Sequence, residues 1–216
     1  MDQRERSVSA RRGATHAVAQ AHLAAADEVM ADLIARLGDC TLWHTPRPAF
    51  PTLCSAIIGQ QISTRAAATV EARLRQALGG QLEAQAILRA DEARLRGAGL
   101  SAAKARYLRA LAEARDTVTV EALQPLDDTA AMKRLTAIHG IGPWTAEMFL
   151  IFVLQRPDVF SMGDIGLRNT INRLYAGGAK LDARATHAIT DRWAPWRSIG
   201  CWYLWRLLDG DDGVWQ

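Results

Sequence analysis

The stretch LTAIHGIGPWTA, residues 135–146, decides the fold that this sequence predicts. Apolar residues lead into a Gly-Ile-Gly-Pro turn at residues 140–143, and a second apolar segment follows directly. Glycine permits backbone angles and close approaches that residues with a Cβ resist. Proline suits the first turn of a helix, where its missing N–H costs nothing. The pattern therefore predicts two helices joined by a tight hairpin, at about residues 129–154.

The start of the helix after this turn is a candidate anion site. The first amide groups of a helix lack intrahelical partners and carry the positive end of the helix dipole. A phosphate is a suitable partner for such a site. We therefore expect the turn to bind a DNA backbone through Gly140, Ile141, Gly142 and Thr145. For Gly-x-Gly alone, an ordinary corner between two helices is the alternative.

The rest of the chain indicates helix after helix, with short connectors and no strand. One long helix is expected over residues 18–37, and Pro195 is expected to open the last helix. Polar residues predict where five other helices begin: Ser63, Ser101, Asp128, Asp164 and Asp182. The predicted fold class is all-α, with two helical lobes and a cleft between them. Residues 1–15 are expected to be a basic, flexible tail, and residues 16–216 a single all-α unit.

Composition narrows the class of protein. The chain has 216 residues, a net charge of +3 and a pI near 9.0, which is compatible with nucleic acid as a partner. No apolar segment reaches the ~20 residues that a membrane span needs, and the amino terminus does not resemble a signal peptide. Cys40, Cys54 and Cys201 are far apart in apolar surroundings, which indicates reduced core thiols. We expect a cytoplasmic, DNA-associated protein without a membrane partner.

The sequence resembles the helix-hairpin-helix DNA glycosylases, in which a Gly/Pro-rich loop is followed by an aspartate. Among them it is similar to the AlkA-like DNA-3-methyladenine glycosylases (type II). Longer members place a small β-rich domain ahead of the helical lobes, so a compact form without that domain is expected here. The matching blocks follow the family's order: residues 57–63, Gly99-Leu100-Ser101 with Lys104 and Tyr107, residues 138–146, residues 158–164 and residues 195–198.

This resemblance implies base-excision repair, with Asp164 as the catalytic carboxylate. The expected reaction is hydrolysis of the N-glycosidic bond of alkylated purines, 3-methyladenine and also 7-methylguanine, in double-stranded DNA by base flipping. An ionised carboxylate stabilises the positive charge that builds on the deoxyribose as the bond breaks. The alternative role of Asp164 is a helix N-cap, and both roles can coexist.

One missing residue predicts the subtype. Glycosylases that also cut the strand carry a lysine nucleophile near the start of the second hairpin helix. Here that stretch is Trp144-Thr145-Ala146-Glu147, without a lysine. A monofunctional enzyme that uses water is therefore expected.

The resemblance also implies a base pocket and a wedge. Trp144 and Trp205 match positions that line the pocket, while Met148 and Ile165 stand where well-known members carry aromatic residues. The pocket is therefore expected to be less aromatic than theirs. Gln61 is the expected wedge that fills the gap left by the flipped base. Its alternative role is a polar residue in a turn before Ser63.

No cofactor is expected to be required. The resemblance allows a structural Na⁺ or K⁺ at the hairpin, held by the backbone carbonyls of Thr136, Ile138 and Gly140. The expected partner is double-stranded DNA containing alkylated bases, bound by a monomer. Two alternatives remain open: a non-catalytic helix-hairpin-helix DNA-binding protein, and a glycosylase for oxidised or mismatched bases. Side chains expected to help hold phosphates are Arg65, Lys104 and Arg168.

Overall fold

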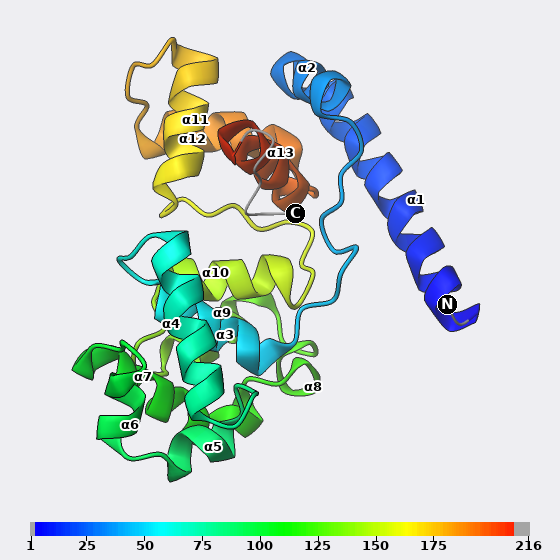
Figure 1. The fold of residues 1–216 in the computed structure, drawn as a ribbon. Coiled ribbons are helices and arrows are strands. Elements are labelled where there is room, and N and C mark those ends of the chain that lie inside the picture. Colours follow the sequence, from blue (N-terminus) through cyan, green and yellow to red (C-terminus); the bar gives the residue numbers. More distant parts are fainter. Residues whose placement is uncertain (1–2, 210–216) are drawn as a thin grey trace. The chain divides into compact units, whose positions relative to one another are not determined.

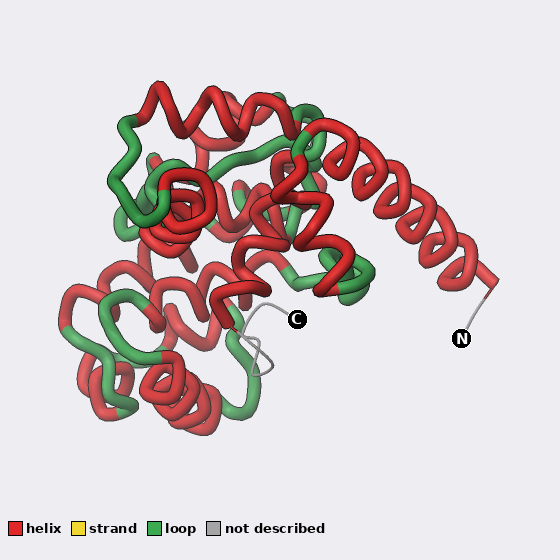
Figure 2. Tube along the Cα trace, turned by 90° about the horizontal axis from the view of Figure 1, so that it is seen from above, coloured by secondary structure: helices red, strands yellow, loops and turns green. Residues whose placement is uncertain are grey.

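The computed structural model describes the backbone of residues 3–209 and the side chains of residues 15–63 and 65–208. This part of the chain contains helices and loops but no strand (Figures 1 and 2), which confirms the all-α prediction. None of its helices has the length and apolar character that crossing a bilayer requires.

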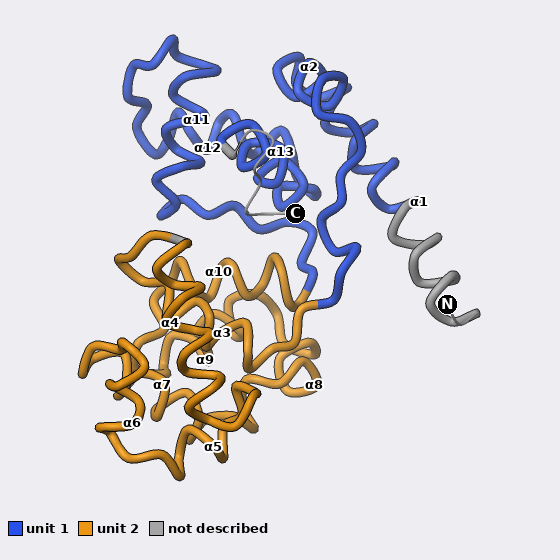
Figure 3. Tube along the Cα trace, in the orientation of Figure 1, with its two compact units in different colours: residues 1–46, 155–216 blue, residues 47–154 orange. Residues whose placement is uncertain are grey.

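The chain divides into two compact units, coloured separately in Figure 3. Unit 1 combines Met1–Pro46 with Gln155–Gln216, and unit 2 is Arg47–Leu154. The two lobes expected from the sequence correspond to these units, whereas residues 16–216 were expected as a single unit. Pairing between the two ends of the chain is a long-range property, and sequence patterns within short windows do not report it.

Unit 2 is built around α10, which contacts both α3 and α9. Helix α10 is apolar nearly all round, and seven of its ten residues are buried, as expected for a central helix. Phe149 on α10, Ile57 on α3 and Leu135 on α9 are at most 1% exposed. The helices of unit 2 are α3 (Ala49–Gly59), α4 (Thr64–Ala77), α5 (Ala84–Arg89), α6 (Glu92–Gly97), α7 (Ala102–Glu113), η1 (Arg115–Thr117), α8 (Val120–Leu123), α9 (Asp128–Thr136) and α10 (Pro143–Phe152).

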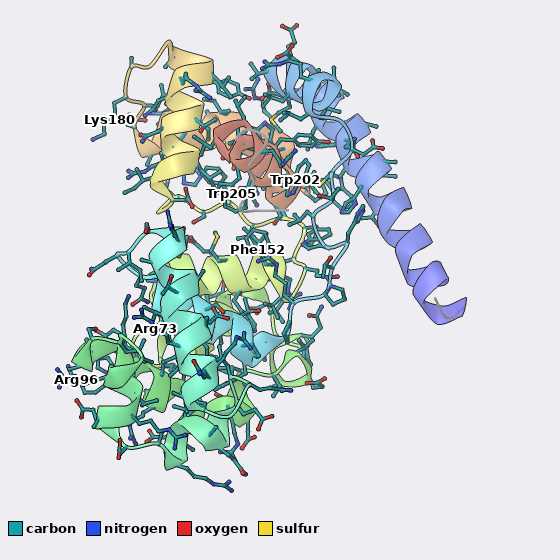
Figure 4. All side chains as sticks on the ribbon, in the orientation of Figure 1. Arg73, Arg96, Phe152, Lys180, Trp202 and Trp205 are labelled. Carbon is teal, nitrogen blue, oxygen red and sulfur yellow. The ribbon has the colours of Figure 1, made fainter. Side chains whose placement is uncertain are left out.

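Unit 1 is organised around α13, which contacts α1, α2, α11 and the short helix η2. Trp202 and Trp205 project from α13 (Figure 4), and each is only 2% exposed. Together with Trp193, which is fully buried, they supply most of the aromatic core. The helices of unit 1 are α1 (Gln3–Ala26), α2 (Glu28–Leu37), α11 (Ile165–Ala176), α12 (Ala183–Thr190), η2 (Asp191–Trp193) and α13 (Arg197–Asp209).

A buried aspartate divides the long helix expected over residues 18–37. Asp27 is 4% exposed and has an extended backbone between α1 and α2. Its carboxylate accepts the amides of Val29 and Met30, which makes it the N-cap of α2. The prediction of one continuous helix was therefore wrong at this position.

The same carboxylate joins three parts of unit 1. Its Oδ2 accepts hydrogen bonds from the Tyr175 hydroxyl at 2.8 Å and from the Trp193 indole N–H at 2.9 Å. Arg192 forms an ion pair with it at 3.1 Å. Hydrogen bonds to a charged group contribute about 1.5–3 kcal/mol each, whereas helix propensities differ by less than about 1 kcal/mol per residue. The tertiary contacts therefore outweigh local helix preference.

The predicted helix starts are mostly correct. Ser63, Ser101, Asp164 and Asp182 are N-caps whose side chains accept a backbone amide. The cap of α9 is Asp127 rather than Asp128, because the Asp127 side chain accepts the Ala130 amide at 2.7 Å. The last helix begins at Arg197, two residues after Pro195.

Helix α1 includes most of the segment expected to be a tail. The described backbone is helical from Gln3, within residues 1–15. Residues 3–15 contain four arginines and no proline, and arginine favours helix. The flexibility expected for residues 1–15 remains a prediction.

The three cysteines are buried and free, as the sequence predicted. Burial raises the pKa of Cys40 and of Cys54 to about 12, so neither is a thiolate at neutral pH. We expect iodoacetamide to leave the native chain unmodified while it labels all three residues in urea. Intact-protein mass spectrometry would measure this, and fast labelling of the native protein would contradict the burial described here.

Candidate functional site

The hairpin between α9 and α10 is closed by its own backbone and by two apolar side chains. The Ile138 amide donates to the Leu135 carbonyl at 3.1 Å, and the Ile141 amide donates to the Ile138 carbonyl at 3.0 Å. The side chains of Ile138 and Ile141 are buried. Because the Ile141 amide is used inside the turn, it is not a good candidate for a phosphate contact.

Gly140 has a role inside the turn that no other residue can fill. Its φ is +98°, in the region that favours glycine. A Cβ at this position would lie 2.3 Å from Cγ of Tyr107, whose ring covers the turn. The glycine is therefore required for α7 to pack against the hairpin, before any ligand is considered.

Gly142 differs from Gly140 in both respects. Its φ of −89° and ψ of 173° are ordinary for any residue, and a Cβ there would meet nothing within 4 Å. Of the two roles that glycine can fill here, unusual backbone angles or close approach of a partner, only close approach remains for Gly142. Only a partner outside the chain would benefit from a missing side chain there.

The first turn of α10 has the features of an anion site. Gly142 is the N-cap, Pro143 opens the helix, and no side chain caps it. The Thr145 side chain is 4% exposed, so any contact of Thr145 with a phosphate would be made by its backbone amide. The DNA-binding roles of these residues remain predictions.

The turn after α3 is tied to the hairpin by a glutamine that the sequence analysis did not single out. The Gln60 side-chain amide donates to the Gly140 carbonyl at 2.9 Å. The next residue, Gln61, is exposed and has a φ of +59°, which is uncommon for a residue with a side chain. Gln61, the expected wedge, thus stands on a turn fixed to the hairpin, and its neighbour Ile62 is 40% exposed.

Asp164 lies in unit 1, at the N-terminus of α11. Its Oδ1 accepts the Leu167 amide at 2.9 Å, and its own amide donates to the Ser161 carbonyl at 3.1 Å. The side chain is 8% exposed. The N-cap role considered for Asp164 is therefore confirmed, while its catalytic role remains a prediction.

The expected pocket residues come from both units. Trp144 and Met148 lie on α10 in unit 2, and Ile165 and Trp205 lie on α11 and α13 in unit 1. Trp144 is 37% exposed and Ile165 is 65% exposed, whereas Met148 and Trp205 are buried. Of these four residues, one in each unit is therefore exposed.

Leu208 is an apolar neighbour of Asp164 that the sequence did not suggest. Its Cδ1 lies 3.0 Å from the place a Cβ would take at Gly166, and Oδ1 of Asp164 lies 3.1 Å from the same point. Leu208 is 43% exposed. It is therefore an exposed aliphatic residue beside the carboxylate.

The basic residues expected near phosphates differ in whether their side chains are held by the protein or exposed. Lys104 donates from Nζ to the Ile58 carbonyl at 2.7 Å, and partial burial lowers its pKa. It therefore holds the C-terminal end of α3 rather than an open position on the surface. Arg65 and Arg168 are exposed, and their phosphate contacts remain predictions.

A family model described as "HhH-GPD superfamily base excision DNA repair protein" matches residues 54–195. The chain belongs to this superfamily. The matched range begins in α3, contains the hairpin, Gln61 and Asp164, and ends just before α13.

Individual members of the HhH-GPD superfamily support the same assignment. The Bacillus subtilis relative YfjP is 33% identical over 168 residues, which cover 73% of this chain, and the chain spans 58% of that relative's length. A crystal structure of a Bacillus halodurans DNA-3-methyladenine glycosidase is 35% identical, with a TM-score of 0.75 and coverage of 85% and 86%. The Schizosaccharomyces pombe 3-methyladenine DNA glycosylase Mag1, in complex with abasic DNA, is 30% identical, with a TM-score of 0.78 and coverage of 91% and 98%.

The monovalent cation expected on the carbonyl oxygens of Thr136, Ile138 and Gly140 remains a prediction for this HhH-GPD chain. The Ile138 carbonyl accepts the Ile141 amide, and the Gly140 carbonyl accepts the Gln60 amide. Each carbonyl oxygen has a second lone pair, so these bonds leave capacity for a cation together with Thr136. Among the described residues, no group of three or more His, Cys, Asp or Glu side chains could hold a metal ion.

Proposed function

We propose that this HhH-GPD protein is a monofunctional DNA glycosylase of base-excision repair. Its substrate would be an alkylated purine, chiefly 3-methyladenine and also 7-methylguanine, in double-stranded DNA. The carrying observation is an aspartate held at a helix N-terminus within the family-matched range, 22 residues after Gly142. Both solved relatives described above are named for 3-methyladenine, and Mag1 was solved with abasic DNA.

Asp164 would stabilise the reacting sugar. As the bond between the base and C1′ breaks, its electron pair moves to the purine and positive charge develops on the deoxyribose. The carboxylate stabilises that charge electrostatically, and water then adds to C1′ and gives up a proton. The Leu167 amide fixes the rotamer of Asp164, which keeps the carboxylate oriented before the substrate arrives.

The leaving base needs little assistance. An alkyl group at N3 or N7 gives the purine a formal positive charge, and bond cleavage releases it as a neutral base. The indole of Trp144, which is partly exposed, is suited to such a cation and would contribute about 1–2 kcal/mol when desolvated. Ile165 and Leu208 offer only apolar contact, which favours lesions that are already labile through their own charge.

The hairpin would hold the DNA backbone. The start of α10 offers amides, the positive end of a helix and the open side of Gly142 to a phosphate. Gln61 on the neighbouring turn would enter the space that the flipped nucleotide leaves. The expected state is a monomer on duplex DNA, with a Na⁺ or K⁺ at the hairpin carbonyls as an optional structural ion.

The proposal is tested by product analysis on methylated duplex DNA. We expect release of free 3-methyladenine and an intact strand with an abasic site, because residues 143–147 contain no lysine to form a Schiff base. Liquid chromatography would identify the free base, and borohydride should trap no covalent complex. Binding without base release would favour a non-catalytic DNA-binding protein, and release of an oxidised or mismatched base alone would favour the other alternative.

A further inference from the structure

The loop that leads to Asp164 makes several hydrogen bonds and an ion pair with the start of α13. Residues 155–163 form no helix and lead directly into Asp164. Loops are generally more mobile than helices, yet a group that acts on a reacting sugar must be placed within a fraction of an ångström. Some part of unit 1 therefore has to fix this loop.

Ser198 bonds the loop backbone from both sides. Its Oγ donates to the Arg156 carbonyl at 2.7 Å and accepts the Val159 amide at 3.0 Å. Its own amide donates to the Pro157 carbonyl at 3.0 Å. The side chain is fully buried, so its hydroxyl relies on these backbone partners rather than on water.

An ion pair fixes the residue between these contacts. Arg197 donates from Nε and Nη2 to the two carboxylate oxygens of Asp158, at 2.7 and 2.8 Å. The Arg197 amide also donates to Asp158 at 3.3 Å, so the same carboxylate stands at the start of α13. A two-point contact of this kind fixes direction as well as distance.

Two further contacts complete what we call the loop clamp, the interaction of residues 156–160 with residues 193–201. The Cys201 thiol lies 3.7 Å from the Val159 carbonyl, and the ring of Phe160 meets that of Trp193 edge-on, with centroids 6.2 Å apart. Every residue from 156 to 160 therefore has a partner in this segment. Asp164 follows four residues later.

We propose that Ser198 and the Asp158–Arg197 pair are positioning residues for Asp164. This inference rests on the proposed function, because it takes Asp164 as the catalytic carboxylate. The loop clamp contacts no substrate. It acts by holding the entry to α11 in one place, so that the carboxylate meets the sugar in the productive geometry.

The ion pair between Asp158 and Arg197 also determines the pH range in which the loop clamp remains intact. Hydrogen bonds from Arg197 hold the pKa of Asp158 below its ordinary value. The stabilisation is therefore fully present above the usual aspartate range and is lost as the pH falls through the lowered pKa of the folded state. At neutral pH the pair is charged and the loop clamp is closed.

The main test is a Ser198→Ala variant of the full chain, measured in single-turnover excision of 3-methyladenine. We expect the rate to fall on the order of 10- to 100-fold, because small misplacement of a catalytic group costs about that much. Affinity for abasic-site DNA should change less than about threefold, since the hairpin is untouched. An unchanged excision rate would contradict the proposal.

Thr186→Ala is the matched control. Thr186 is a buried residue of the same unit, and its hydroxyl donates to the Asp182 carbonyl at 2.8 Å, away from the loop. It should lose similar stability but keep the wild-type rate, and an equal loss of rate would contradict the proposal. If Ser198→Ala does not fold, Arg197→Gln replaces it, because that side chain is partly exposed. The same fall in rate is expected.

A double variant separates positioning from general destabilisation. If the loop clamp acts through Asp164, adding Ser198→Ala to Asp164→Asn should lower the residual rate no further. A full additional loss would overturn the proposal. A wild-type chain that releases no methylpurine would contradict the proposed function and the loop clamp with it. Normal wild-type release, with both Ser198→Ala and Arg197→Gln at the wild-type rate, would contradict the loop clamp alone.

Discussion

Asp164→Asn is expected to fold normally and to excise methylpurines about 10³-fold more slowly than the wild-type chain. Asparagine is as good an N-cap as aspartate, so the bond from the Leu167 amide and the start of α11 should survive. What disappears is the negative charge that the proposed function places next to the sugar, and loss of one preorganised electrostatic contact can cost about this much in rate. Single-turnover kinetics on methylated duplex DNA would measure the effect.

Asp182→Asn provides the matched control for this result. Asp182 caps α12 in the same unit by accepting the Ala185 amide at 2.7 Å, and it is exposed. The substitution is chemically the same, but we expect no change in excision. Abasic-site DNA should still bind to both variants. Wild-type turnover by Asp164→Asn would show that the carboxylate serves only as a cap.

Gly140→Ala is expected to destabilise the protein by about 2–4 kcal/mol, the cost of a strained backbone combined with overpacking. The new Cβ would lie 2.3 Å from Cγ of Tyr107, and a φ of +98° is strained for alanine. The turn or α7 must therefore shift. Urea unfolding of the variant would give the free energy directly, and a wild-type value would mean that the turn can relax without cost.

Gly142→Ala should give the opposite result. Its backbone angles suit alanine and a Cβ has open space, so stability should change by less than about 1 kcal/mol. A methyl group facing the DNA would hinder a phosphate. Affinity for abasic-site DNA should therefore fall about tenfold, which corresponds to one charge-assisted hydrogen bond. If the Gly142→Ala variant binds abasic-site DNA with wild-type affinity, the phosphate does not bind beside Gly142.

Local features of the sequence predicted local structure well. Ser63, Ser101 and Asp182 could be identified as caps because the cap and the amide it accepts lie within three residues of each other. The hairpin was predicted for the same reason, since glycine and proline restrict the backbone where they stand. The cap of α9 was predicted at Asp128 and lies at Asp127. Such an error of one residue is expected when two adjacent aspartates can both act as an N-cap.

Features set by distant partners were missed. Asp27 ends α1 because Tyr175 and Trp193, which lie 148 and 166 residues away, share its carboxylate. Nothing in the apolar pattern of residues 18–37 indicates that break. The pairing of the two ends of the chain in unit 1 also depends on contacts between residues far apart in the sequence.

The sequence identified the main residues of the candidate site but not their individual contacts. Asp164 and the hairpin came from sequence, yet Ile141 uses its amide within the turn and Lys104 holds the Ile58 carbonyl. Each depends on a contact that the sequence does not show. Gln60 and Leu208 were given no role in the site, because their importance lies in what they touch.

The sulfur chemistry of the fold has a consequence for an enzyme of this kind. Methylating electrophiles that damage purines also attack thiolates, the nucleophilic form of cysteine. Here all three sulfurs are buried, and the thiols of Cys40 and Cys54 stay protonated at neutral pH. Methylating electrophiles therefore find few reactive thiols on this protein. We expect it to keep its proposed excision activity after an exposure to such reagents that inactivates thiol-dependent enzymes.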